Sequence, residues 1–202
     1  ITEISKSRMR VSTDEEYTFV LYKGELRRLR ICQGQEIEED ALRAVREEIL
    51  PKRARLRAMN LLQNRDYTVR QLHDKLKEGG YPEEVIGEAL SYVEGFGYTD
   101  DLRYAVNFIH CHAGDRSRRR IEQDLLGRGI PRDVLERAWA EWEEEGGIQD
   151  EQGMIRSLLR KKGFDCQAAG PKERARMYGF LLRKGFLGEQ VRRALGCGEW
   201  EE

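Results

Sequence analysis

The feature that most constrains the fold of this chain is an internal repeat. Residues 72–90 align with residues 121–139 at a constant offset of 49 residues. Repeated segments of this kind are supersecondary units that bury their apolar faces against neighbours, so the sequence predicts a tandem array. The matched residues are Leu76 and Leu125, Gly80 and Gly129, Tyr81 and Ile130, Pro82 and Pro131, Val85 and Val134, and Ala89 and Ala138.

Glycine, an apolar residue and proline follow one another in both copies, and this order has one physical explanation. Gly80 and Gly129 can take the left-handed conformation that ends many helices. The proline two residues later opens the next helix, where its missing N–H is not needed. Thr68 and Ser117 are hydroxyl residues suited to cap the start of the helix that ends at this glycine. Each copy is therefore expected to be a helical hairpin with a tight turn.

A third, weaker copy lies at residues 177–195, and an apolar segment precedes each hairpin, at 58–62, 105–109 and 155–159. Each unit is thus expected to contain three helices. Because a unit of this size buries little surface alone, we expect an all-α fold in which three tandem three-helix repeats stack into an elongated, curved array. A single compact helical domain with vestigial repeats is the alternative.

The first thirty residues have a different pattern. Three segments, 4–11, 16–22 and 25–31, are rich in β-forming residues, and the last two meet at Lys23-Gly24, which suggests a hairpin. A short β-rich extension is therefore expected before the repeats. The predicted organisation is a β-rich region over residues 1–34, a linking helix over 35–51, and repeats over 52–99, 100–149 and 150–202.

Composition narrows the functional class. The chain is 39% hydrophobic and 36% charged, and it has no apolar run long enough to cross a membrane. We therefore expect a soluble cytoplasmic protein and no membrane partner. Because the chain begins at Ile1 instead of methionine, we also expect that its natural N-terminus has been trimmed. The four cysteines, Cys32, Cys111, Cys166 and Cys197, include no Cys-x-x-Cys pair, which argues against structural zinc.

Asp100 and Asp101, directly before an apolar run, raise the question of an active site. Residues 148–151 repeat the same pattern, an apolar residue, a spacer and two acidic side chains, before the next expected helix. Helix capping therefore explains the pair better than acid–base chemistry. The three residues 110–112, His-Cys-His, diverge by about 100° each on a helix and do not converge on one metal ion. With no phosphate-binding loop either, we expect no catalytic residue, metal or cofactor.

Three segments carry a family resemblance. GYTDDLRYAVNFI at 97–109, RRRIEQDLLGRGI at 118–130 and residues 61–86 resemble the RecX family of regulatory proteins. The resemblance extends from about residue 53 to 194 and is most specific in the first two units. Its motif positions are Asp100, Asp101, Tyr104, Ala105, Gly129 and Pro131.

The resemblance implies a modulator without enzymatic activity. RecX proteins lie in the groove of the RecA filament on single-stranded DNA, impede its ATP hydrolysis, strand exchange and co-protease activity, and in some cases bind DNA directly. A monomer that negatively regulates a RecA-type filament is therefore expected. The alternative is a direct DNA-binding module whose helix pairs contact phosphates, although the net charge of −1 gives this no support.

Helix geometry indicates which cations would face a partner. In the helix after Ser117, Ile121 and Leu125 mark the core side, and Arg119 and Arg120 point roughly opposite. Equivalent positions of the third unit are also basic, so units two and three are expected to share a basic face. A solvated helix surface is the plain alternative. The predicted binding residues are Arg116, Arg118, Arg119, Arg120, Lys172, Arg176, Arg183 and Lys184.

Overall fold

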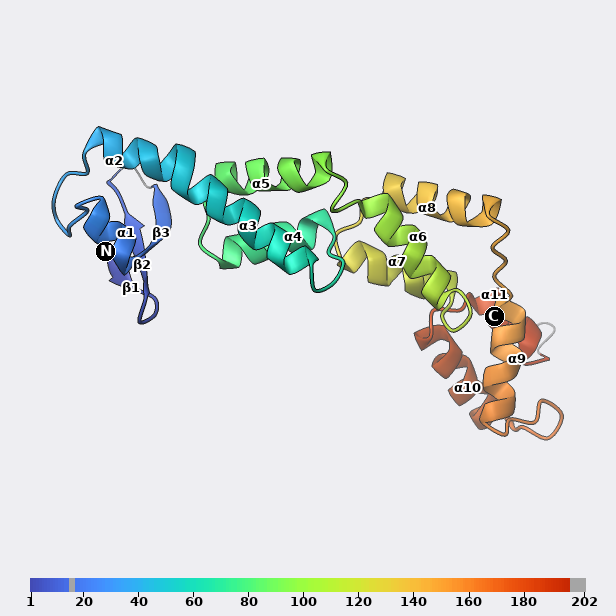
Figure 1. The fold of residues 1–202 in the computed structure, drawn as a ribbon. Helices are drawn as coiled ribbons and strands as arrows, with labels where there is room; N and C mark the ends of the chain where they lie inside the picture. The colour runs from blue at the N-terminus through green and yellow to red at the C-terminus, as the bar shows by residue number, and fades with distance from the viewer. Residues whose placement is uncertain (15–16, 197–202) are drawn as a thin grey trace. The chain divides into compact units, whose positions relative to one another are not determined.

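A computed structural model describes residues 1–14 and 17–196, so Cys197 and the end of the predicted third repeat lie outside the described residues. The chain forms two compact units, residues 1–100 and 101–202 (Figure 1). The first unit contains the N-terminal sheet and repeat 1, and the second contains repeats 2 and 3. The fold is mostly helical, with three tandem three-helix repeats and a small sheet, as predicted.

The N-terminal sheet has three antiparallel strands in the order β1-β2-β3. They are β1 (Thr2–Glu3), β2 (Arg8–Ser12) and β3 (Thr18–Tyr22). Val11 pairs with Phe19 in the register, and both are buried. The sheet therefore packs its apolar face against the core of repeat 1. A sheet of only two or three strands needs such packing for stability.

The prediction of a strand at 25–31 is wrong, because residues 25–28 belong to helix α1 (Lys23–Arg28). The Glu25 carboxylate accepts a hydrogen bond from the backbone N–H of Tyr22 at 2.7 Å and satisfies a donor of the first helical turn. Leu26 is buried and Leu29 half-buried, a spacing of three residues that fits one helix face. The hairpin instead connects β2 to β3, where Thr13 N–H donates to the Tyr17 carbonyl.

The linking helix runs without a break into repeat 1. It consists of α2 (Glu39–Ala44), a π-helical turn η1 (Val45–Ile49) and α3 (Leu50–Leu62). The backbone stays in the helical region at Val45 and Leu50, so the predicted boundary after residue 51 falls inside a continuous helix. Pro51, two residues after the π-helical turn, lacks the N–H that a regular helix would use.

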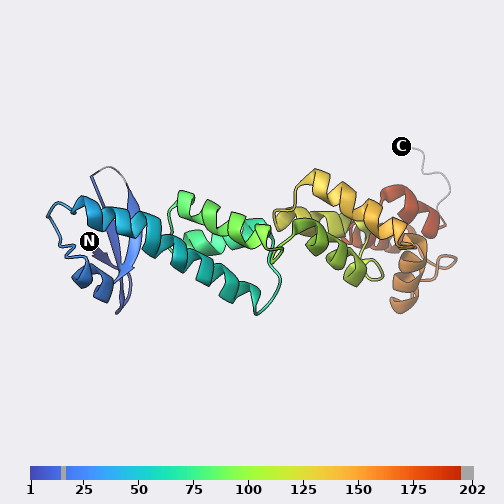
Figure 2. The ribbon, with the colours of Figure 1, turned by 45° about the horizontal axis from the view of Figure 1, so that its top comes forward.

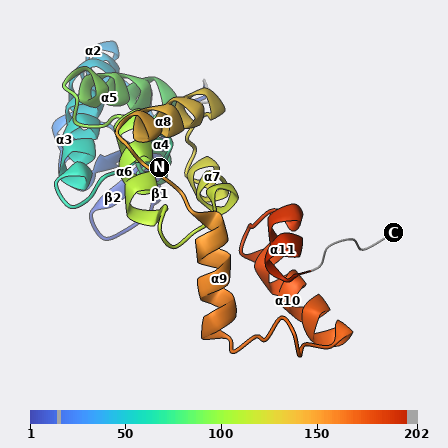
Figure 3. The ribbon, with the colours of Figure 1, turned by 90° about the vertical axis from the view of Figure 1, so that its right-hand side faces the viewer.

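Each repeat consists of three helices around its own apolar cluster, as the sequence predicts. Figure 2 shows α3 beside α4 and α5 in the first unit, and Figure 3 shows α9 beside α10 and α11. The remaining helices are α4 (Val69–Glu78), α5 (Glu83–Gly95), α6 (Asp101–His112), α7 (Arg118–Gly127), α8 (Arg132–Glu144), α9 (Glu151–Lys161), α10 (Pro171–Arg183) and α11 (Gly188–Ala194).

The tight turn within each repeat has the predicted geometry. Gly80, Gly129 and Gly185 have φ values of 82°, 87° and 91°, which is the left-handed region. The residue after each glycine donates its N–H to the carbonyl five residues earlier, for example Ile130 to Leu125 at 3.1 Å. The prediction of a glycine-ended hairpin is therefore confirmed in all three repeats.

The predicted caps are also confirmed. The hydroxyl oxygens of Thr68 and Ser117 accept hydrogen bonds from the backbone N–H of Gln71 and Arg120, at 3.1 and 3.3 Å. Both capping residues are buried, so these polar atoms need partners inside the protein. Trp139 is buried in the core of repeat 2 at the repeat position of Leu90.

Candidate partner-binding surface

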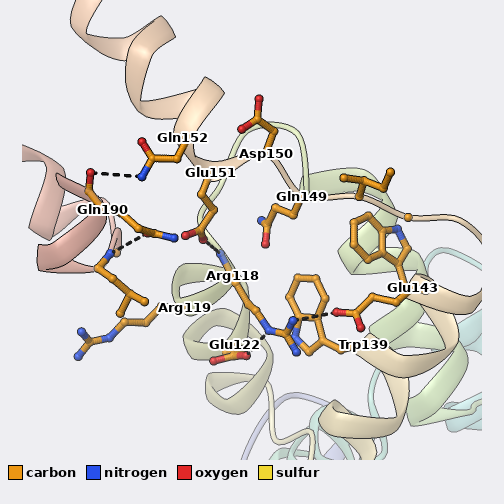
Figure 4. Close-up of a pocket in the computed structure, with 15 residues that line it drawn as sticks. Arg118, Arg119, Glu122, Trp139, Glu143, Gln149, Asp150, Glu151, Gln152 and Gln190 are labelled. Carbon is orange, nitrogen blue, oxygen red and sulfur yellow. Dashed lines mark hydrogen bonds and ion pairs between the residues drawn. The ribbon is translucent and has the colours of Figure 1, made fainter. Parts of the chain in front are cut away.

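Repeats 2 and 3 meet around the N-terminus of α7. Ser117 Oγ donates to the Lys184 carbonyl at 2.9 Å, which joins the cap of α7 to the end of α10. The Glu151 carboxylate at the start of α9 accepts from the backbone N–H of Arg118 at 2.7 Å (Figure 4). A carboxylate near a helix N-terminus is also favoured by the helix dipole. The N-terminus of α7 is therefore held by both neighbouring helices of repeat 3.

A groove of about 810 Å³ lies at this junction. Its wall includes Arg118, whose guanidinium covers the Trp139 ring at 4.3 Å from the ring centroid. Two large apolar side chains line it while exposed, Ile148 at 87% and Leu187 at 52%. Exposed apolar side chains in a concave surface are typical of contact sites for another molecule.

Three of the predicted basic residues are engaged within repeat 2. Arg118 pairs with Glu143 at 2.9 Å and with Glu122 at 3.2 Å. Asp124 pairs with two of the others, Arg116 at 2.9 Å and Arg120 at 3.0 Å. These guanidinium groups already have carboxylate partners, so a large part of their charge is neutralised locally.

The other five predicted cations differ from these three. Their side chains are exposed, and none forms an ion pair with a residue of ranges 1–14 and 17–196. Figure 4 shows Arg119 extending away from Arg118, on the side of Gln190. This group consists of Arg119 on α7, Lys172, Arg176 and Arg183 on α10, and Lys184 at the C-terminal end of α10.

Lys162 extends the basic group beyond the predicted set. Its ammonium lies 5.5 Å from the centroid of the Phe180 ring, and that of Lys184 lies 5.9 Å from the same centroid. The basic run at residues 160–162 was the only sequence signal for it, because the contact between α9 and α10 depends on the tertiary fold. Lys162 and Lys184 therefore flank one aromatic ring.

The motif residues of the family resemblance lie at helix ends or in the core of repeat 2. Asp101 begins α6, Ala105 is buried in it, and Pro131 precedes α8. The hydroxyl of Tyr104 accepts a hydrogen bond from Arg128 Nη1 at 2.7 Å. We call the segment that connects one repeat to the next a joint. At the joint between repeats 2 and 3, the Asp150 carboxylate occupies the equivalent position, accepts a hydrogen bond from the Gly153 N–H at 2.8 Å and caps α9.

The predicted divergence of residues 110–112 is seen in their contacts. His110 lies 2.9 Å from a Glu145 carboxylate oxygen, whereas His112 lies 3.5 Å from Asp115. Within the described part of the chain, there is no group of three or more His, Cys, Asp or Glu side chains that could hold a metal ion.

One shared feature of the joints was not found from the sequence. The Thr99 hydroxyl donates to the Tyr67 carbonyl at 2.8 Å, and the Gln149 amide donates to the Arg116 carbonyl at 2.8 Å. Each donor is the spacer before the acidic pair, and each acceptor directly precedes a helix cap. The repeated position was visible in the sequence, but threonine and glutamine share no pattern that reveals the common bond.

These features define a class: a helical-repeat protein whose exposed groove and basic side chains suit binding to a macromolecule. Family models for the first, second and third three-helix domains of RecX match residues 54–92, 100–138 and 149–195. The chain belongs to the RecX family of regulatory proteins. Among the helices of the described residues, none is long and apolar enough to cross a membrane.

Relatives and solved structures agree with this membership. Regulatory protein RecX of Caldanaerobacter subterraneus is 32% identical over 96% of this chain and 98% of its own. RecX of Vibrio vulnificus is 37% identical over 68% of this chain and 88% of its own. A crystal structure of regulatory protein RecX has a TM-score of 0.62 at 21% identity, covering 98% and 96% of the two chains. RecX from Lactobacillus salivarius has a TM-score of 0.59 at 17% identity, covering 73% and 96%.

Proposed function

We propose that this protein is a negative regulator of a RecA-type recombinase. It binds non-covalently in the groove of the RecA filament on single-stranded DNA and inhibits ATP hydrolysis, strand exchange and co-protease activity. It works in the cytoplasm as a monomer, without a catalytic residue or cofactor of its own. Membership of the RecX family supports this function, and the surface of repeats 2 and 3 supports the mode of binding.

The observation that carries the proposal is the combination of apolar and basic side chains at the groove. Ile148 and Leu187 are exposed next to Arg119, which forms no ion pair within the described residues. Apolar contacts contribute little to binding the phosphate backbone of DNA, which is recognised mainly through charge. Protein interfaces combine apolar groups with arginine. The groove therefore favours a protein surface, such as a filament subunit, with acidic groups or DNA phosphates beside it.

The ion pairs divide the basic residues into two roles. Arg119, Lys172, Arg176, Arg183 and Lys184 contact the filament. The second role falls to Arg116, Arg118 and Arg120, which organise repeat 2 through Asp124, Glu122 and Glu143. Exposed ion pairs stabilise a fold by only about 0–1 kcal/mol, so these three remain secondary contributors to binding.

Charge reversal tests the proposal. We expect the double variant Arg119→Glu and Arg176→Glu to need at least about tenfold more protein for half-inhibition of RecA ATP hydrolysis on single-stranded DNA, because two attractive contacts become repulsive. The control is Arg70→Glu, since Arg70 occupies in repeat 1 the position of Arg119, although it pairs with Asp74 at 3.6 Å. Both variants should melt near the wild-type Tm. Equal inhibition by the double variant and the control contradicts the proposed binding face.

A direct DNA-binding module is the second candidate, favoured by the exposed cations of α7 and α10. Such binding is expected to weaken steeply with salt, by a log–log slope of about −0.7 per phosphate contact on a single strand. Anisotropy of a labelled oligonucleotide without RecA measures it. Inhibition of RecA at protein concentrations that leave bare DNA unbound selects the filament proposal over this one.

A further inference from the structure

A second concave site lies in the first unit, where the N-terminal sheet meets repeat 1. It has a volume of about 620 Å³. Arg8 of β2, Tyr22 at the end of β3, Arg53 and Arg57 of α3 and Lys75 of α4 line it. Arg53 and Arg57 are four residues apart, which places both guanidinium groups on the same face of α3. Three elements, β2, α3 and α4, thus bring four cations together.

The lining carries an excess of positive charge. Glu78 is the single carboxylate among its lining residues, and it pairs with Lys75 at 2.7 Å. Arg57 is exposed and forms no ion pair with any described residue. Cations gathered in a concave surface attract an anion more strongly than the same cations spread over a convex one.

Two of the arginines are held in place. The Arg53 guanidinium pairs with Glu25 at 2.9 Å and lies over the Tyr22 ring, 4.5 Å from its centroid. Arg8 Nη2 donates to the Gly79 carbonyl at 2.6 Å. A guanidinium carries five N–H donors, so both arginines keep donors beyond these bonds. Fixed donors bind an anion with less loss of side-chain entropy.

These bonds tie the sheet to the helices, but they do not explain the whole site. Arg57 takes part in none of them, and Tyr22 is 44% exposed although its ring is part of the lining. A buried structural clasp would need neither an unpaired cation nor an accessible aromatic ring. Phosphate groups form paired hydrogen bonds with the guanidinium groups of arginines held in place, and aromatic rings stack on nucleobases.

We propose that this pocket binds one nucleotide, with its phosphate at Arg57, Arg53 and Arg8 and its base against the ring of Tyr22. Its volume lies within the range of about 300–1,000 Å³ typical of pockets for small ligands. The nucleotide is either free or part of a single strand, since both present the same phosphate and base. The site goes beyond the proposed function, because it uses none of the residues of repeats 2 and 3.

The test is fluorescence anisotropy of the full chain with a fluorescein-labelled oligothymidylate at low salt. Arg57→Gln is expected to weaken binding about tenfold, the loss of one charge-assisted phosphate contact. Lys52→Gln is the matched control, because Lys52 is exposed on the same helix and does not line the pocket. Tyr22→Leu should weaken binding, and Tyr22→Phe, which keeps the ring, should restore it.

Competition identifies the source of the nucleotide. Displacement of the oligonucleotide by thymidine monophosphate supports a site for a free nucleotide, whereas retention supports one for a single strand. If Arg57→Gln binds the oligonucleotide as tightly as Lys52→Gln, the pocket is not the site and the proposal is wrong. Displacement by polyglutamate at equal charge concentration overturns it too, because the pocket would then recognise carboxylates. RecA inhibition, measured in the same variants, reports on the proposed function separately.

Discussion

Repeats 1 and 2 share their joints but differ in their surfaces. In repeat 1 the Thr99 hydroxyl bonds to the Tyr67 carbonyl, and in repeat 2 the Gln149 amide bonds to the Arg116 carbonyl. The acceptor directly precedes a buried cap, Thr68 or Ser117. Both joints thus satisfy a backbone carbonyl, which is buried at Tyr67 and partly buried at Arg116. The bond is retained although the donor residue differs.

The surfaces around the joints show no such equivalence. Asp124 of repeat 2 pairs with Arg116 and Arg120, whereas the positions equivalent to these two arginines in repeat 1 are Tyr67 and Gln71. Backbone geometry is fixed by the need to end one helix and begin the next, and this need is the same in every repeat. Surface charge has no such constraint, so it is free to specialise each repeat for a partner.

Valine at the turn glycines should have the largest effect on stability. Gly80→Val and Gly129→Val both force a β-branched residue into the left-handed region, at a cost of about 2 kcal/mol. At Gly80 a Cβ would in addition collide with Cγ2 of Val20, so Gly80→Val is expected to cost about 3 kcal/mol in all. Thermal denaturation followed by circular dichroism measures both as a lower Tm.

A third glycine provides the control. Gly87 lies inside α5 with open space around it, so Gly87→Ala should raise stability by about 0.5–1 kcal/mol. A wild-type Tm for Gly129→Val would show that the turns of repeats 1 and 2 are not equivalent.

Ser117→Ala should have an intermediate effect. The substitution removes the cap of α7 and the bond to the Lys184 carbonyl, and it leaves two partly buried backbone groups without their hydroxyl partner. The expected loss is about 1–2 kcal/mol. Ser157→Ala, at an exposed site on α9, should melt like the wild type. If the two alanine variants melt together, the contact between repeats 2 and 3 at Ser117 contributes nothing to stability.

The turns and caps were predictable because their causes are local. A glycine with positive φ, a proline after it and a hydroxyl before a helix each act within a few residues. The segment at 25–31 was misread for the opposite reason. Its leucines fit either a strand or one face of a short helix, and the Glu25 carboxylate that bonds to the Tyr22 N–H is also held by Arg53, twenty-eight residues away. Such tertiary contacts leave no local pattern.

The candidate site shows the same limit. Helix geometry placed Arg119 and Arg120 on an outer face, and the i,i+4 spacing of Arg120 and Asp124 made their ion pair foreseeable. The pair between Arg118 and Glu143 was not foreseeable, because it joins α7 to α8. The groove beside Ile148 and Leu187 likewise exists only once repeats 2 and 3 have packed. Charge could be counted from the sequence, but its pairing required the fold.

The smallest expected effect is a difference between repeats 1 and 2 in how stability depends on pH. In repeat 1, Lys77 bonds to Glu83 across the turn at 2.6 Å, whereas the equivalent residues of repeat 2, Leu126 and Arg132, cannot form such a pair. The hydrogen bond from Lys77 lowers the pKa of Glu83 below 4.5, and Glu83 raises the pKa of Lys77 above 10.5. A carboxyl with a lowered pKa stabilises the fold above its unfolded pKa, and this contribution is lost as pH falls through its folded pKa. For Lys77 the contribution is complete below 10.5 and is lost as pH rises through its folded pKa.

Glu83→Gln should therefore lower the Tm slightly between about pH 5 and pH 10, and the difference should disappear as pH falls through the folded pKa of Glu83, where the wild-type carboxyl becomes protonated too. The effect is small because both side chains are exposed. Arg132→Gln, at the equivalent position of repeat 2, should not change the Tm differently at these pH values. A Tm difference for Glu83→Gln that persists at low pH would mean that the residue acts through packing instead of charge. The turns of repeats 1 and 2 would then differ in more than their surface ions.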